Sequence, residues 1–166
     1  MKLWNKEDNL DKKIEEFTVG NDRKYDMYLA KYDVIASIAH AKMLCKINIL
    51  SDEESTKIIN ALNNIFKNIE SENFNIENDF EDIHSKIESL LIDELGNIGK
   101  KIHTGRSRND QVLVATQLFL KNEINEIKKL TVKLFNTLID LAETNKKELL
   151  PGYTHLQVAM PSSFGL

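Results

Sequence analysis

Apolar side chains recur at helical spacing along most of the chain. A first helix is predicted over about 24–46, and its apolar stripe consists of Tyr25, Tyr28, Leu29, Tyr32, Ile35, Ala36, Ala39 and Met43. A second begins at the capping-box pattern Ser51-Asp52-Glu53-Glu54, and its stripe consists of Ile58, Leu62, Ile65, Phe66 and Ile69. A third is predicted over about 81–95 and ends at Gly96; its inward positions are Ile83, Ile87, Leu90 and Leu91. No convincing β alternation is present, so the pattern predicts a helical protein.

A much longer helix is predicted after the loop 96–105. It begins at a second capping-box pattern, Ser107-Arg108-Asn109-Asp110, and runs to about Lys147, before Pro151-Gly152. At ~1.5 Å per residue it would be roughly 55 Å long, whereas a compact globule of this chain length has a radius of gyration near ~15 Å. Its apolar stripe consists of Leu113, Leu120, Ile124, Ile127, Leu134, Leu138 and Leu141, with Gln117 and Thr131 in the gaps. We therefore expect other subunits or further helices to cover it.

Composition argues against nucleic-acid-binding, membrane and secreted proteins. The net charge of -4 and the pI of about 5.6 provide no basic surface for nucleic acid or for a membrane. The apolar runs are too short to span a bilayer, and the charged N-terminus lacks the apolar core of a secretory signal. A single cysteine, Cys45, excludes an internal disulfide. These features predict a cytoplasmic protein that binds neither nucleic acid nor membrane.

The segment best suited to chemistry precedes the long helix. Four cations and no acid lie between Lys100 and Arg108. The backbone N–H groups of a helix N-terminus, the hydroxyls of Thr104 and Ser107 and the amide of Asn109 add further donors. This arrangement favours an anion site, most simply for a carboxylate. A solvated basic loop with a good helix cap explains the spacing equally well.

Histidines mark two further candidate sites. His155 follows Thr154 in a turn after the long helix, and an imidazole can transfer protons near neutral pH. A surface or capping histidine is the alternative, and it is favoured when the turn is considered alone. His84 and Glu88 share one helix face, but a metal site would need further ligands at suitable spacing, and none is evident. An ordinary hydrogen-bonded pair is therefore favoured there, and His40 is interpreted as a packing residue.

Three segments, in this order, resemble the argininosuccinate lyase and δ-crystallin family. The run from His103 to Val112 closely resembles the family's HTGRSRNDQV stretch. That stretch is specific, because fumarases, aspartases and adenylosuccinate lyases share the fold but not this string. Residues 81–84 are similar to the family's DEDIH region, and 154–161 to its THLQ…QP segment. The resemblance extends from about Phe17 to Leu166.

The resemblance implies an all-α fold. Residues 1–106 would form a small N-terminal helical domain with a substrate-binding loop, and residues 107–166 would begin a central bundle of long helices. The assembly would be a homotetramer whose bundle pools helices from all subunits, with each active site built from three chains. The reaction would be the reversible β-elimination of L-argininosuccinate to L-arginine and fumarate in arginine biosynthesis, without a metal or an organic cofactor.

Family roles carry over to the positions that match. His155 would be the histidine of the catalytic acid–base pair, and His84 would line the site near it. Asn109 and Thr154 would bind substrate, with Arg108 beside them as a fork for a carboxylate.

Two departures from the family pattern affect these roles. Asp26 matches a substrate-binding aspartate at the start of the first helix, but the serine that often precedes it is missing, and Asn21 or Asp22 would replace it. The family's mobile Gly-Ser-Ser-x-Met-Pro-x-Lys loop, which carries a catalytic serine, would lie beyond Leu166. Because Met160–Leu166 is also interpreted as the start of another helix, we expect a longer parent protein and an inactive isolated chain.

Other functions stay open. A non-catalytic relative, structural in the manner of the lens crystallins, would share the same segments. A lyase of the superfamily that acts on another fumarate-yielding substrate, such as adenylosuccinate, would share the fold. A free-standing binding module is disfavoured, because it would leave the long helix uncovered.

Overall fold

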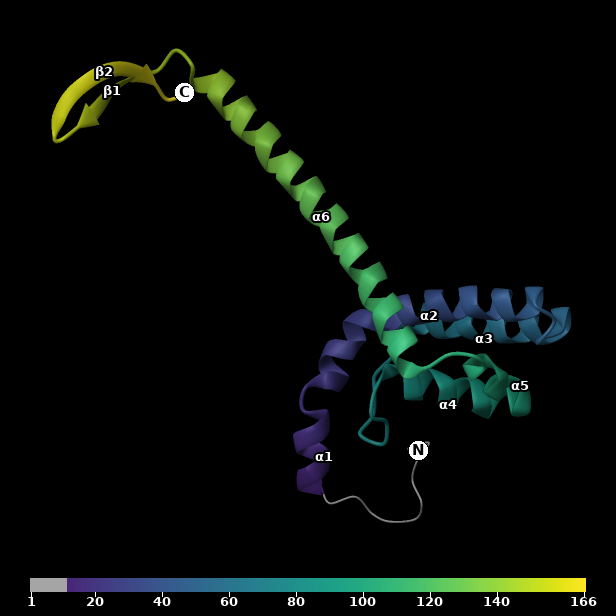
Figure 1. Ribbon diagram of the computed structural model, residues 1–166. Helices are drawn as coiled ribbons and strands as arrows, with labels where there is room; N and C mark the ends of the chain where they lie inside the picture. The colour runs from purple at the N-terminus through teal and green to yellow at the C-terminus, as the bar shows by residue number, and fades with distance from the viewer. Residues whose placement is uncertain (1–11) are drawn as a thin grey trace. The chain divides into compact units, whose positions relative to one another are not determined.

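The structure is a computed structural model that describes residues 12–166 (Figure 1). Its elements are α1 (Lys12–Val19), α2 (Asp22–Lys46), α3 (Asp52–Glu70), α4 (Ile83–Leu95), α5 (Asn97–Lys100), the 3₁₀ segment η1 (Lys101–His103), α6 (Arg108–Asn145), β1 (Leu149–Thr154) and β2 (Gln157–Ser163). The predicted helical fold class is confirmed. The short helix α1 and the two strands were not predicted, and the predicted loop 96–105 contains α5 and η1.

The helices α3 and α4 bury the faces that their periodicity predicted. Ile58, Leu62 and Ile65 of α3 are buried, and Phe66 and Ile69 are partly buried against the same core. Ile83, Ile87 and Leu91 of α4 meet them there. Each fully buried aliphatic side chain stabilises the fold by about 1.5–3 kcal/mol, so these two stripes hold the N-terminal helices together.

The helix α2 buries a different face from the predicted one. Of the predicted stripe only Tyr32 is buried, whereas Tyr25 and Tyr28 are 60% and 62% exposed. The buried positions of α2 are Ala30, Tyr32, Asp33, Val34, Ser37, Ala41 and Leu44. The prediction failed because the buried face includes an aspartate and a serine, which apolar periodicity excludes. A second apolar face of α2 consequently stays exposed.

Both predicted capping boxes form. Ser51 Oγ accepts from the backbone N–H of Glu54, and Glu54 Oε2 accepts from the backbone N–H of Ser51, each at 3.1 Å. Before α6, Asp110 Oδ2 accepts from the N–H of Ser107 at 2.8 Å, and Ser107 Oγ accepts from the N–H of Asp110 at 3.4 Å. These local bonds set where α3 and α6 begin.

Gly99 allows α5 to lie directly against α4. A Cβ atom at this position would lie 2.2 Å from the carbonyl oxygen of Leu91, which is backbone and cannot rotate away. Gly99→Ala is therefore expected to lower the free energy of unfolding by about 1–3 kcal/mol, measured by urea denaturation. The exposed neighbour Asn97→Ala is the control and should change stability by less than about 0.5 kcal/mol. Equal stability of the two variants would contradict this close approach.

The C-terminal residues form a β-hairpin, so the prediction of another helix at Met160–Leu166 is wrong. The strands β1 and β2 are antiparallel, with Pro151 opposite Pro161 and Thr154 opposite Gln157. Proline lacks an N–H donor and disfavours a helix interior, but it is tolerated in a two-stranded ribbon whose outer edges are free. Most residues of both strands are exposed, so neither strand has a buried face. Without a buried face, the strands need no alternation of apolar and polar residues, which is the pattern that would have predicted them.

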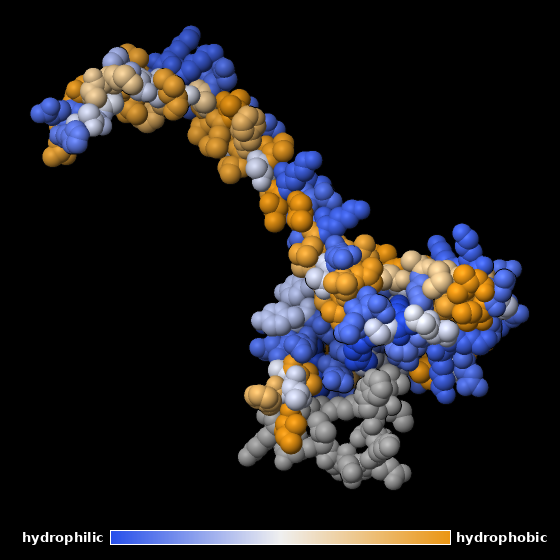
Figure 2. All heavy atoms as spheres, in the orientation of Figure 1, coloured by the Kyte–Doolittle hydropathy of each residue, from blue (hydrophilic) through white to orange (hydrophobic). Residues whose placement is uncertain are grey.

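The chain divides into two compact units, residues up to Leu120 and residues from Lys121, so the boundary falls within α6. Along α6 the predicted stripe is exposed, and Figure 2 shows apolar side chains gathered on this helix. Exposed apolar residues outside that stripe, Val132, Phe135 and Ile139, widen the apolar surface beyond a single coiled-coil seam. Among residues 12–166, none of the helices combines the length and the apolar composition that a bilayer crossing requires.

Candidate functional site

The cations between η1 and the first turn of α6 make specific contacts within the N-terminal unit. Lys101 Nζ lies 2.5 Å from Glu54 Oε1. Arg106 donates to Ser37 Oγ at 3.1 Å, and Arg108 donates to Ser85 Oγ at 3.0 Å. The loop is therefore bonded to its own domain at several points, so it is not simply a solvated basic segment.

The N-terminus of α4 is where Asp26 and Arg108 converge. Asp82 caps this helix, because its Oδ1 accepts from the N–H of Ser85 at 2.8 Å, while its Oδ2 binds the guanidinium of Arg108. Asp26 Oδ2 accepts from the N–H of Ile83 at 3.1 Å. A guanidinium has five N–H donors, so Arg108 keeps donors for a further carboxylate. The side chain of Asn109 is exposed on the next residue of α6.

Burial perturbs the carboxyl group of Asp26. Desolvation raises its pKa, and the smaller opposing effects are the hydrogen bond from Ile83 and the charge of His84. Because the folded pKa lies above the unfolded one, Asp26 favours folding only at acid pH, and this contribution is lost as the pH rises through the folded pKa. Ionised Asp26 is thus a cost that the fold carries at neutral pH.

Asp26→Asn is expected to increase the free energy of unfolding at pH 7, because an amide oxygen can still accept from Ile83 without an ionisation cost. The gain should vanish near about pH 3.5, where the carboxyl group is largely neutral in both states. Urea denaturation at the two pH values measures this. Asp22→Asn, in the exposed first turn of the same helix, is the control and should not stabilise at pH 7. Destabilisation by Asp26→Asn at pH 7 would contradict the expectation.

His84 and Glu88 have separate partners, so the expected pair between them is not observed. His84 Nδ1 lies 2.9 Å from Asp33 Oδ1, and both side chains are almost completely buried. Glu88 Oε2 lies 3.5 Å from Nδ1 of His103. Within residues 12–166, no group of three or more His, Cys, Asp or Glu side chains is placed to hold a metal ion.

Sequence reasoning missed a buried polar cluster beneath the loop. Asp33, Ser37 and Gln111 are at most 3% exposed, and Arg106 lines the same small space as Ser37 and Gln111. His40 was interpreted as packing, but its Nε2 lies 3.1 Å from the carbonyl oxygen of Thr104. The available signal was polar residues spaced four and three apart along a helix, at positions 33, 37 and 40.

Thr154 and His155 belong to the second unit, at the tip of the hairpin. His155 and Leu156 form its two-residue turn, with φ angles of 51° and 62°. Positive φ at both central residues is the geometry of a type I′ turn, which usually requires Gly, Asn or Asp. The His155 side chain is exposed. An exposed imidazole in a constrained turn can exchange protons with a bound molecule.

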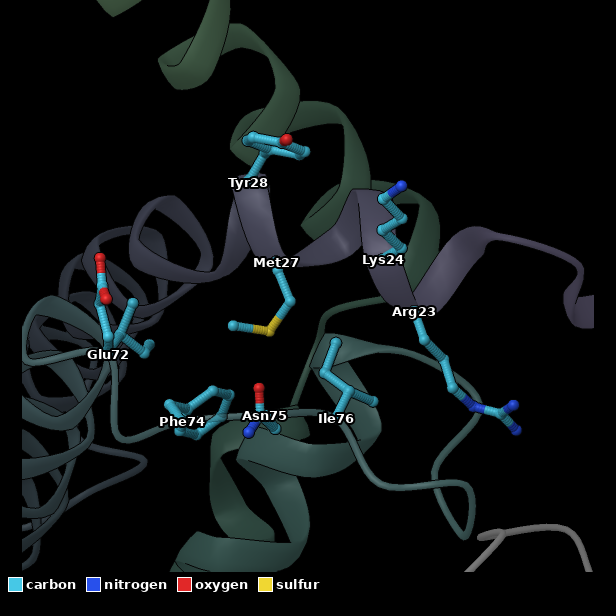
Figure 3. A pocket seen from close by; sticks show the side chains of 9 residues that line it. Arg23, Lys24, Met27, Tyr28, Glu72, Phe74, Asn75 and Ile76 are labelled. Atoms are coloured by element: carbon cyan, nitrogen blue, oxygen red, sulfur yellow. The ribbon is translucent and has the colours of Figure 1, made fainter.

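An open groove of about 750 Å³ lies between α2 and the segment that follows α3 (Figure 3). Figure 3 shows Met27 pointing from α2 toward Phe74 and Asn75. Arg23 donates to the carbonyl oxygens of Phe80 and Asn78 at 2.7 and 2.9 Å, which ties this segment to α2. None of the candidate site residues lines the groove.

Comparison with known proteins places the chain among lyases. A family model described as "Lyase" matches residues 5–166. The argininosuccinate lyase of Bacteroides fragilis is 50% identical over 165 residues, which are 99% of this chain and 37% of that protein. The argininosuccinate lyase of Thermotoga neapolitana is 45% identical over 163 residues, 98% of this chain and 41% of that protein. The chain thus spans well under half the length of these curated relatives.

A solved structure supports the fold. The crystal structure of fumarate lyase from Mesorhizobium sp. BNC1 matches with a TM-score of 0.65 over 89% of this chain and 36% of that chain. At 21% sequence identity, this likeness concerns the fold alone.

Proposed function

Because the chain belongs to the lyase family, we propose that it is the N-terminal part of an argininosuccinate lyase. The proposed reaction is the reversible β-elimination of L-argininosuccinate to L-arginine and fumarate. The observation that carries it is identity of 45–51% to curated argininosuccinate lyases over nearly the whole chain. The convergence of Asp26 and Arg108 at the start of α4, beside the N-terminus of α6, adds a geometric reason.

The residue types suit this chemistry. A base takes the proton from the carbon next to a carboxylate, the C–N bond breaks as the C=C bond forms, and an acid protonates the departing guanidinium nitrogen. The negative charge that develops on the carboxylate needs donors fixed in advance. We assign these donors to Arg108, Asn109 and Thr154, with Ser107 and Thr104 nearby.

Other residues would transfer the protons and bind the arginine half of the substrate. We assign His155 to the acid–base pair and place His84 at the edge of the site. Asp26 would bind the cationic half of the substrate, since one oxygen of its carboxylate binds Ile83 and the other can accept from a ligand. No metal or organic cofactor has a role in this proposal.

The proposal extends to assembly and location. Seven apolar residues of α6 form a stripe that is exposed in the described part of the chain, so we propose a homotetramer whose bundle buries it. We propose a cytoplasmic location, because Cys45 is a free thiol, which suits a reducing compartment.

An assay of the full-length protein tests this function. Purified protein is given argininosuccinate, and fumarate formation is followed by ultraviolet absorbance, with adenylosuccinate as the second substrate. Turnover of argininosuccinate alone is the expected result. Turnover of adenylosuccinate alone would assign another lyase activity, and no turnover would favour a crystallin-like structural role. Fumarate release by the isolated 166-residue chain would contradict its expected inactivity.

A further inference from the structure

A polar seam runs along α2 from its buried face to the half-buried His40. It consists of Asp33, Ser37 and His40, which lie four and three residues apart and so share one side of the helix. Asp33 is 0% exposed and Ser37 is 1% exposed. Such positions normally hold apolar side chains in a helix that packs on two others. Buried polar side chains need hydrogen-bonding or charged partners, and residues of the loop before α6 provide some of these partners.

The loop is attached to this seam and to α4 at three successive places. His40 Nε2 donates to the carbonyl oxygen of Thr104 at 3.1 Å. Arg106 donates to Ser37 Oγ at 3.1 Å. On the other side, Nδ1 of His103 lies 3.5 Å from Glu88 of α4. Two helices thus hold residues 103–106, immediately before the cap of α6.

Arg106 is the central attachment between the loop and α2. Its surroundings do not favour a charged side chain, so it adds little to the stability of the fold. Its Nε is buried without a hydrogen-bond partner in the described structure. The nearby carboxylate of Asp33 has His84 as its partner, with Oδ1 at 2.9 Å from Nδ1 of that histidine. Burial lowers the pKa of Arg106, while the charges of Asp33, Glu88 and Asp110 raise it. The space among Ser37, His84 and Arg106 has no room for a water molecule. A partly buried cation with incomplete hydrogen bonding gains little over an apolar residue, so stability alone does not explain it.

We propose that Arg106 is a positioning residue, which fixes the segment from His103 to the first turn of α6 on the polar seam so that Arg108 and Asn109 can bind a carboxylate of the substrate. This rests on the proposed function. Arg106 directly precedes Ser107, whose side chain caps α6, so its bond to Ser37 anchors the chain just before the helix that carries Arg108 and Asn109. Displacement of a binding group by about 1 Å can lower the rate about 100-fold.

The test compares variants of the full-length protein. Arg106→Gln removes the charge, and Arg106→Lys keeps the charge without the planar fork. The double variant Asp33→Asn, Arg106→Gln removes the charges of both residues. Lys42→Gln, on the exposed side of α2, is the control for loss of a cation. The measurements are kcat and KM for argininosuccinate, the thermal midpoint, and hydrogen exchange of the peptide that spans residues 103–110.

We expect Arg106→Gln to lower kcat/KM about 100-fold and to speed exchange of residues 103–110 about tenfold. Exchange of α3 should not change. The double variant should regain the thermal midpoint, since no uncompensated charge is left, but not the activity. Arg106→Lys should recover part of the activity, and Lys42→Gln should match the wild type.

Several results would overturn the proposal. Activity of Arg106→Gln within about threefold of wild type would do so, and so would activity that returns with stability in the double variant. If the wild type does not cleave argininosuccinate, the proposed function fails. Hydrogen exchange of residues 103–110 then tests, without any activity, whether Arg106 holds this segment. Unchanged exchange of residues 103–110 would show that Arg106 does not hold the loop. If Arg106→Gln does not fold, the Lys and double variants carry the same comparison.

Discussion

His155→Gln in the full-length protein is expected to lower kcat for argininosuccinate by about 10²–10⁴-fold. Glutamine keeps a polar side chain in the turn but cannot accept or release a proton near neutral pH. If His155 acts in the transition state and contributes little to ground-state binding, KM should stay within about threefold of the wild type. Steady-state fumarate formation measures both constants.

The hairpin itself provides the control for this variant. Leu156 occupies the second turn position with φ of 62° and is 98% exposed, so Leu156→Gln places the same side chain in the same turn. That variant should retain the wild-type kcat. A His155→Gln variant as active as Leu156→Gln would mean that His155 is a surface residue, which is the alternative that the turn allows.

Two charges in the apolar stripe of α6 should dissociate the assembly. Ile127 and Leu134 are 62% and 60% exposed in the chain, and both lie on the stripe proposed to be buried between subunits. The double variant Ile127→Lys, Leu134→Lys would bury two cations in an apolar bundle, at a cost of at least several kcal/mol per subunit. We expect the full-length variant to elute as free subunits or dimers and to lose at least about 99% of its activity, because the proposed sites are shared between chains.

A matched pair of substitutions controls for charge. Asn125 and Asn136 lie on the polar side of α6, so Asn125→Lys with Asn136→Lys adds the same two charges away from the stripe. Light scattering should find this control as a tetramer and the stripe variant as smaller species. A stripe variant that is still tetrameric would show that another surface holds the subunits together.

The positions of most helices followed from local sequence. The capping boxes at Ser51 and Ser107 each involve residues three apart, and the stripes of α3 and α4 pack as their spacing predicted. Such interactions lie within one or two helical turns, so they can be inferred without knowing the rest of the fold. The resemblance was carried by His103–Val112, which is also a local string, and the match to the lyase family agrees with it.

Non-local contacts decided the remainder. Asp33 and Ser37 make α2 bury a mixed face, because Arg106 and His84 arrive from distant parts of the chain to meet them. The hairpin depends on pairing between two exposed segments, neither of which has an amphipathic period of its own. The sequence by itself determined the longer helices, the starts of α3 and α6, and the position of the basic segment before α6. Only the tertiary structure decided which face of α2 is buried and which partner each buried polar group has. The physical reason is that a buried charged or polar side chain is stable only where a partner from another part of the chain compensates its loss of hydration.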